Sequence, residues 1–269
     1  MSATARDLWP CWDTAAARLS GPAPLLACFD YDGTLVGIRP TPEEAVASDE
    51  VREALAALAR APGTTVAVVS GRPLESLRAM IPGASVWRVG RHGISVEAPG
   101  EPAHDTVDVA VATRALDPLR RVGEAIVRER PGTRLEDKGA ALALHTRAAS
   151  HSDAAVAAET FDTEAARLEG FEVLVGKEIH EVRPKGADKG RAVAAIRARV
   201  APGGRLLYVG DDTTDEDVFA AVPAGDPSVV TVRVGGGEPT RAAYRVGGPD
   251  DVLELLRRLA RLRTDRSTA

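Results

Sequence analysis

The sequence predicts an α/β protein whose mostly parallel sheet is interrupted by a smaller, inserted α+β domain. Short apolar runs that end in a polar residue alternate with helical patterns, an order typical of right-handed βαβ units. The middle of the chain breaks this alternation with two helix–strand–strand sequences in succession. Of the 269 residues 44% are apolar and 27% charged, so the chain can bury one large core or two modest ones.

Four apolar runs predict buried strands, because each is short, is apolar on both faces and is bounded by turn residues. The runs are Leu25–Asp30, Thr65–Ser70, Leu206–Asp211 and Val229–Val234. The first three end in Asp, Ser and Asp. Ligands of parallel sheets bind beyond the carboxyl ends of the strands, so we expect these three polar residues to lie close together.

Helical patterns separate the strands. Ser48 can cap a helix over residues 49–60, and Pro73 suits the first turn of a helix over residues 73–80. Further patterns predict helices over residues 191–200 and 251–262.

The inserted domain is predicted over residues 109–183, with residues 1–108 and 184–269 forming the larger core. Helical patterns at 112–130 and 152–168 are each followed by two strand-like runs with hairpin-length links. These runs cover residues 133–138, 140–147, 171–176 and 178–184. The resulting αββαββ order predicts a small antiparallel sheet with helices on one face.

Charge and composition exclude several classes of partner. A net charge of -5 argues against general electrostatic binding to nucleic acid or to an anionic membrane. The apolar runs are far shorter than the roughly 18 residues of a membrane span, and the basic start of a signal peptide is missing. Two cysteines, Cys11 and Cys28, make no disulfide framework. We expect a cytoplasmic protein whose partner is a small molecule.

The motif DYDGTL, Asp30–Leu35, places two carboxylates two residues apart on the loop that leaves a buried strand. Gly33 permits a tight turn there, so both carboxylates can face one ligand beyond the sheet edge. Two aspartates alone would be an ordinary turn pair, but the Gly-Thr-Leu that follows favours a site.

The motif GDDTTDEDVF, Gly210–Phe219, follows another buried strand and is rich in acids. Packing so many carboxylates is costly without a cation, which indicates a hard metal ion bound through oxygen. Helix capping by the later acids is the second interpretation. We expect both, with Asp211 and Asp212 on the metal side.

Two weaker motifs point to a phosphoryl group. Ser70-Gly71-Arg72 follows the second strand, and Lys189-Gly190 opens a helix. A hydroxyl, backbone N–H groups and a lysine from separate strands would cradle phosphoryl oxygens. Taken singly, the serine is more often a helix cap and the lysine more often points to water.

In this order the four motifs resemble those of the haloacid dehalogenase superfamily of phosphotransferases, which implies a Rossmann-like core with an inserted cap. Further motifs are similar to those of trehalose-6-phosphate phosphatases. They are Gly90–Gly93 (GRHG), Glu136-x-Lys138, His145-Thr146-Arg147 and Gly176–Gly190. The resemblance runs from about Leu25 to the final helix and leaves residues 1–24 unexplained.

The resemblance implies a role for each core residue. Asp30 would be the nucleophile, and Asp32 would protonate the departing sugar oxygen and then activate water. Mg²⁺ would be held by the Asp30 carboxylate, the main-chain carbonyl of Asp32 and Asp211, with Asp212 and, as a further candidate, Asp215 close behind. The phosphoryl oxygens would be bound by Ser70, Gly71 and Lys189.

The resemblance also implies that the cap reads the sugar of trehalose 6-phosphate, and we expect the enzyme to act as a monomer. The residues that match sugar-contacting cap positions are Glu136, Lys138, Arg147, Lys177 and Glu181; Arg72 and His92 are further candidates for substrate binding. From the residues alone, Glu136 and Lys138 could be a solvated cross-strand ion pair. For His92, packing under the sheet edge is an equal alternative, and the choice between scaffold and substrate stays open for Arg72, His145, His180 and Arg183.

Two other functions are compatible with parts of this pattern. A different capped sugar phosphatase, or a phosphomannomutase-like enzyme, would keep the chemistry and change the substrate. A non-catalytic sugar-phosphate sensor would keep the fold alone, but it would not need Asp30, Asp32, Lys189 and Asp211 together.

Overall fold

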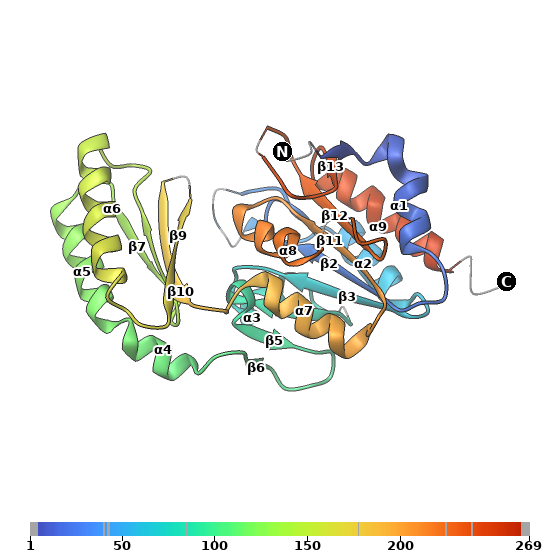
Figure 1. Ribbon diagram of the computed structural model, residues 1–269, viewed down its shortest axis with the longest axis horizontal. Helices are drawn as coiled ribbons and strands as arrows, with labels where there is room; N and C mark the ends of the chain where they lie inside the picture. Colours follow the sequence, from blue (N-terminus) through green and yellow to red (C-terminus); the bar gives the residue numbers. More distant parts are fainter. Residues whose placement is uncertain are drawn as a thin grey trace. The chain divides into compact units, whose positions relative to one another are not determined.

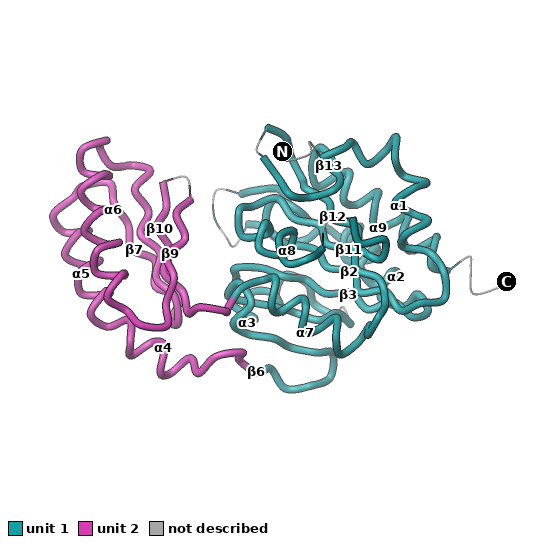
Figure 2. The backbone as a smooth tube through the Cα atoms, viewed as in Figure 1, with its two compact units in different colours: residues 1–104, 188–269 teal, residues 105–187 magenta. Residues whose placement is uncertain are grey.

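The computed structural model describes residues 5–39, 41, 44–83, 85–176, 178–223, 225–237 and 239–264 (Figure 1). The chain divides into two compact units (Figure 2). Unit 1 comprises Met1–His104 and Asp188–Ala269, and unit 2 comprises Asp105–Ala187. The insertion predicted over residues 109–183 lies within unit 2 and ends four residues short of it on each side.

Unit 1 is built on a sheet of nine described strands in the order β1-β13-β12-β11-β2-β3-β4-β5-β6. From β1 to β4 all neighbours are parallel, and β5 runs antiparallel to β4. The bounds are β1 Arg6–Asp7, β2 Leu25–Asp30, β3 Thr64–Val69, β4 Trp87–Gly90, β5 Ser95–Glu97, β6 His104–Asp105, β11 Arg205–Gly210, β12 Val229–Val234 and β13 Tyr244–Val246. The predicted α/β fold with a mainly parallel sheet is confirmed.

Strand β2 lies in the interior of this sheet, between β11 and β3 (Figure 1). All six of its residues are buried. In the register, Asp30 is opposite Val69 of β3, and Phe29 is opposite Val209 of β11. The three strands therefore end at one edge of the sheet. Along this edge, Asp30 lies between Asp211 and Ser70.

Helices cover both faces of the large sheet. One apolar cluster joins α1, α2, α3 and α9 to the sheet, and a second joins α7 and α8 to it. The bounds are α1 Trp12–Leu19, α2 Asp49–Arg60, α3 Leu74–Met80, α7 Lys189–Val200, α8 Glu216–Ala221 and α9 Pro249–Thr264. The hydroxyl of Ser48 accepts a hydrogen bond from the N–H of Val51, so the predicted cap of α2 is present.

The segment before β2, which the family resemblance leaves unexplained, belongs to unit 1. Strand β1 pairs with β13 at the end of the sheet. The indole of Trp9 donates to Asp251 Oδ1 over 2.9 Å, and the guanidinium of Arg258 lies over the rings of Trp9 and Trp12. Two aromatic side chains thus fasten the segment to α9.

Unit 2 contains the antiparallel sheet β7-β8-β10-β9 with α5 and α6 on one side (Figure 1). Its bounds are α4 Val109–Ala115, α5 Asp117–Glu129, β7 Arg134–Asp137, β8 Leu142–His145, α6 His151–Ala165, β9 Phe171–Gly176 and β10 Ile179–Pro184. The helix expected over residues 112–130 is split at Leu116. Pro118 has no N–H to bond to the carbonyl of Arg114, so one helix ends and another begins there.

Alternation along these strands separates two faces of the small sheet. Leu142, Leu144 and Val182 pack into the core with α5 and α6. Side chains that alternate with these along the strands point the opposite way. They include Glu136, His145 and Glu181 and lie on the other side of the sheet, called here the polar face. Among the described helices of either unit, none is both long and apolar enough to cross a bilayer.

Candidate active site

The tight turn after β2 brings the first acidic motif against the second. Asp30 is 4% exposed at the end of the strand, and Gly33 has a φ of +83°. A Cβ atom at Gly33 would lie 2.1 Å from Asp211 Oδ2. Only glycine satisfies both the backbone conformation and this close approach, which explains the Gly of DYDGTL.

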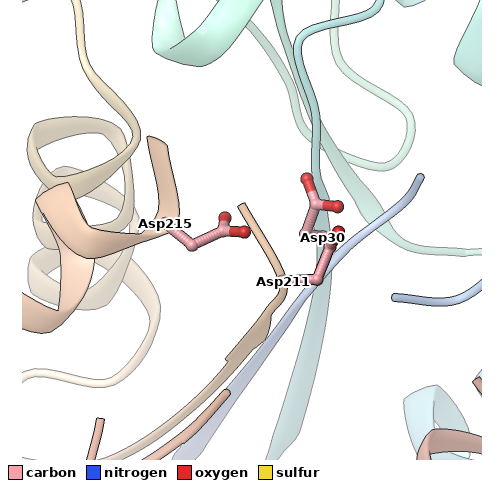
Figure 3. Close-up of side chains that lie close together, drawn as sticks. All are labelled: Asp30, Asp211 and Asp215. Atoms are coloured by element: carbon pink, nitrogen blue, oxygen red, sulfur yellow. The ribbon is translucent and has the colours of Figure 1, made fainter. Parts of the chain in front are cut away.

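Three carboxylates converge at this edge of the sheet (Figure 3). They belong to Asp30, the last residue of β2, to Asp211, which follows β11, and to Asp215 at the end of a 3₁₀ turn, η4, over Thr213–Asp215. One oxygen of each lies within 4.8 Å of the others. Burial and the charge of Asp215 raise the pKa of Asp211 to about 6. Burial also raises the pKa of Asp30, against the charge of Lys189.

This donor set fits a hard divalent cation, which prefers carboxylate oxygen and would offset the repulsion among these groups. The predicted ligands Asp30 and Asp211 are both in the cluster. Asp212 is not: its Oδ1 accepts hydrogen bonds from the N–H and hydroxyl of Thr213, so its side chain caps η4. The described cluster has Asp215 in its place.

Lys189 bridges two of the three carboxylates of the cluster. Its ammonium donates to Asp30 Oδ1 over 2.7 Å and to Asp215 Oδ1 over 2.8 Å, and the residue is 2% exposed. Burial opposes the charge, but Asp215 and Asp30 outweigh it and hold the pKa of Lys189 above its usual range. Asp188 caps α7 by accepting from the N–H of Arg191, which fixes Lys189 as the first helical residue. The solvent-facing interpretation of this lysine is wrong.

Asp215, expected behind the metal ligands, is a member of the cluster itself, and Tyr208 is a site residue that was not predicted. The Tyr208 hydroxyl donates to Asp215 Oδ1 over 2.7 Å, and the N–H of Asp212 donates to Oδ2 over 2.9 Å. With Lys189, Asp215 accepts three hydrogen bonds, which is what a fully buried carboxylate requires. A tyrosine inside an otherwise apolar strand run was the available signal, since its buried hydroxyl needs a partner.

The loop after β3 carries Ser70, Gly71 and Arg72. Ser70 is 1% exposed, and its hydroxyl accepts from the N–H of Arg72 over 3.1 Å. The Arg72 guanidinium donates to both carboxylate oxygens of Asp32, each over 2.6 Å. Arg72 therefore positions Asp32 in this structure.

A left-handed turn joins this loop to the start of α7. Arg91 and His92 have φ values of 51° and 55°, and their N–H groups donate to the carbonyls of Arg72 and Ser70. The imidazole of His92 fills the space beside Gly71, where a Cβ would lie 2.3 Å from Nε2. A Cβ at Gly93 would lie 2.4 Å from the carbonyl oxygen of Asp188. The structure thus shows His92 packing against the loop, and its contact with substrate stays a prediction.

Among the described residues, two close pairs on the polar face of unit 2 contain predicted sugar contacts. Glu136 Oε2 lies 2.8 Å from His145 Nε2, and the Lys138 ammonium donates to Glu181 Oε2 over 2.7 Å. The hydrogen bond with His145 lowers the pKa of Glu136 to about 2. Sugar recognition needs such groups, because carboxylates and ammonium groups can accept from and donate to hydroxyls.

The other predicted sugar contacts, and the residues left open between scaffold and substrate, are not joined to these pairs. Arg147 is 79% exposed in its side chain, and its Nε donates to Glu178. Lys177 lies outside the described residues. His180 pairs with Asp162 of α6, and Arg183 Nε donates to Glu172. Of the two histidines left open by the sequence, His145 therefore lies on the polar face and His180 bonds to the helix layer.

Comparison with known proteins places these features in context. The sequence matches the model of the trehalose-phosphatase family over residues 28–250. It is 33% identical over 244 residues to a trehalose-phosphate phosphatase of Mycobacterium tuberculosis, covering 87% of this chain and 60% of that protein. It is 35% identical over 215 residues to a bifunctional trehalose-6-phosphate synthase/phosphatase of Thermoproteus tenax, covering 79% of this chain and 29% of that protein.

The chain thus spans less than two thirds of the length of these curated relatives. Among solved structures, the C-terminal domain of the C. albicans trehalose-6-phosphate phosphatase superimposes with a TM-score of 0.80 at 26% identity. That match covers 96% of this chain and 99% of the solved chain.

Proposed function

The chain belongs to the trehalose-phosphatase family, and on this basis we propose that it is a Mg²⁺-dependent phosphatase that hydrolyses trehalose 6-phosphate to trehalose and phosphate. The observation that carries the proposal is the buried bridge from Lys189 to Asp30 and Asp215 at the carboxyl edge of the sheet. A buried ammonium beside a nucleophilic carboxylate is suited to a dianionic phosphoryl group.

The reaction divides into two displacements. In the first, an Asp30 carboxylate oxygen attacks phosphorus, the bond from phosphorus to the sugar oxygen breaks, and Asp32 donates a proton to that oxygen. In the second, Asp32 takes a proton from water, which attacks the aspartyl phosphate and releases phosphate from Asp30. Arg72 supports both steps because it fixes the direction of the Asp32 carboxylate.

The phosphoryl oxygens would be bound by Lys189, the Ser70 hydroxyl and the backbone N–H of Gly71. Asp30, the carbonyl of Asp32 and Asp211 would hold Mg²⁺, with Asp212 or Asp215 close behind. When bound, the cation supplies positive charge that lets an anionic carboxylate approach an anionic phosphate.

Unit 2 would act as the cap that selects the sugar. The polar face supplies Glu136, Lys138 and Glu181, and Arg147 and Lys177 would complete the contacts. Arg72 and His92 are retained as candidate substrate contacts. A site built from charged and polar groups binds best the sugar whose hydroxyls match their positions, which supports selection of the sugar by this unit. Action as a cytoplasmic monomer stays a prediction from the sequence.

Phosphate release from trehalose 6-phosphate tests the proposal, with glucose 6-phosphate, mannose 6-phosphate and sucrose 6-phosphate in parallel. Each is assayed with Mg²⁺ and with a chelator. We expect release that depends on Mg²⁺ and is fastest with trehalose 6-phosphate, and no turnover by Asp30→Asn. Preference for another sugar would retain the core chemistry and refute the substrate. Absence of release from every sugar would favour the non-catalytic sensor.

A further inference from the structure

We propose that His145 is a positioning residue for sugar specificity: it fixes the Glu136 carboxylate through Oε2 and leaves Oε1 to accept a hydrogen bond from a sugar hydroxyl. The inference rests on the proposed function, which it deepens by assigning a sugar-binding role to a histidine on the polar face.

The described residues of the small sheet form two histidine–carboxylate pairs that differ in what they connect. His180 Nδ1 lies 2.9 Å from Asp162 Oδ2, so this pair joins β10 to α6 and holds the two layers together. His145 and Glu136 both belong to the sheet, in β8 and β7, whose backbones are already paired. The His145 pair therefore adds no connection between layers. It acts instead by fixing the direction in which the Glu136 side chain points.

Among the described residues, the hydrogen bond and the ion pair of Glu136 both involve the same carboxylate oxygen. Oε2 lies 2.8 Å from His145 Nε2 and 3.8 Å from an Arg134 guanidinium nitrogen. Oε1 accepts no hydrogen bond from the part of the chain that the structure describes. The side chain is 39% exposed, so part of it is open to a ligand on the polar face.

The pair also keeps Glu136 ionised to a lower pH than an ordinary glutamate. The hydrogen bond with His145 lowers the pKa of Glu136 to about 2, with smaller contributions from Lys138 and Arg134. An ionised carboxylate accepts stronger hydrogen bonds than a neutral one. A fixed and ionised Glu136 discriminates best between sugars, because a hydroxyl in the wrong place leaves its charge unpaired.

His145→Leu is the direct test. We expect KM for trehalose 6-phosphate to rise roughly tenfold, within the range given by one lost hydrogen bond to a charged group, with kcat changed less. The kcat/KM for 4-nitrophenyl phosphate, which has no sugar hydroxyls, should stay within roughly twofold of the parent. His145→Gln should recover most of the loss, because its amide can donate to Glu136 Oε2.

His180→Leu is the matched control, since it removes the other histidine–carboxylate pair from the same sheet. We expect it to lower the melting temperature and to change kcat/KM for both substrates by the same factor. In a Glu136→Gln background, His145→Leu should cost less than roughly twofold, because the carboxylate that it positions is already gone.

Three results would overturn the inference: equal losses on both substrates, no recovery in His145→Gln, or additive losses in the double variant. Failure of the proposed function has a different signature, because the parent enzyme itself would then show no preference for trehalose 6-phosphate, and the inference would fall with it. If the parent shows that preference and His145→Leu shows the same preference undiminished, the inference alone is refuted.

Discussion

Arg72 binds Asp32 through Nε and Nη2 of its planar guanidinium, which donate two hydrogen bonds of 2.6 Å to the two carboxylate oxygens. The arginine side chain is 12% exposed and the aspartate side chain 39%. The less exposed partner thus orients the more exposed one, and Asp32 is directed before any substrate arrives.

Replacing Arg72 by lysine should therefore fail to preserve activity. A lysine is a point charge that cannot form the two parallel bonds, so we expect kcat to fall roughly 10- to 100-fold in Arg72→Lys and in Arg72→Ala. Steady-state kinetics at saturating Mg²⁺ measure this. Arg78→Lys, at an arginine paired with Glu97 away from the site, is the control. Activity within twofold of the parent in Arg72→Lys would show that Arg72 acts through its charge alone.

Gly33→Ala should damage metal binding. The new methyl group would collide with Asp211, and a displacement of about 1 Å at a reacting site can cost roughly 100-fold in rate. We expect weaker Mg²⁺ binding by calorimetry and a corresponding loss of turnover. Gly37→Ala lies in the same loop and meets no atom within 4 Å, so it should behave like the parent. Normal Mg²⁺ affinity in Gly33→Ala would remove Asp211 from the metal site.

The ionisation of Glu136 gives stability a defined pH dependence. Its pKa is lowered from 4.5 to about 2, so its contribution is fully present above pH 4.5 and is lost as the pH falls toward 2. Because the side chain is partly exposed, we expect Glu136→Gln to lower the melting temperature at pH 6 by only about 2 °C. The gap between parent and variant should close on acidification. Thermal unfolding at several pH values checks this; a gap that widens toward pH 3 would contradict the sign.

A His145→Leu background provides the control for that measurement. The hydrogen bond from His145 is the main cause of the lowered pKa of Glu136, so the gap at pH 6 should be smaller in this background.

Arg263, near the end of α9, should be important for stability and not for catalysis. Its guanidinium donates to the carbonyl oxygens of Leu19, Gly21, Ala23, Pro62 and Gly63. Removing it leaves these acceptors short of a partner, so we expect Arg263→Ala to lose about 3 kcal/mol, or roughly 5–10 °C in melting temperature. Arg261→Ala, at an exposed position on the same helix, should change little. An unchanged melting temperature in Arg263→Ala would refute this role.

Local patterns were sufficient for much of the fold. Buried strands such as β2 and the cap of α2 at Ser48 depend on a few neighbouring residues, so sequence predicts them well. Pairing between distant segments is not encoded locally. Strand β1 is two residues long and joins the sheet only because β13, more than 230 residues later, offers it an edge. The break between α4 and α5 was predictable from Pro118, but the surrounding helical pattern concealed it.

The candidate site shows the same division. Asp30, Ser70 and Asp211 were expected together because parallel strands end at a common edge, and the register brings them there. Other contacts depend on side-chain directions in three dimensions. They are the hydrogen bond from Tyr208 to Asp215 and the two hydrogen bonds from Arg72 to Asp32. No spacing rule in the sequence specifies either contact.

The burial of β2 also determines how the two thiols of this protein react. Cys28 lies in that strand with no exposed surface, and burial raises the pKa of its thiol, whereas Cys11 is partly exposed. Thiolates are the reactive species toward disulfide reagents, so Cys11 is modified first in the folded protein. Labelling of Cys28 requires the interior strand to open, and its rate therefore reports directly how often the sheet that carries Asp30 unfolds.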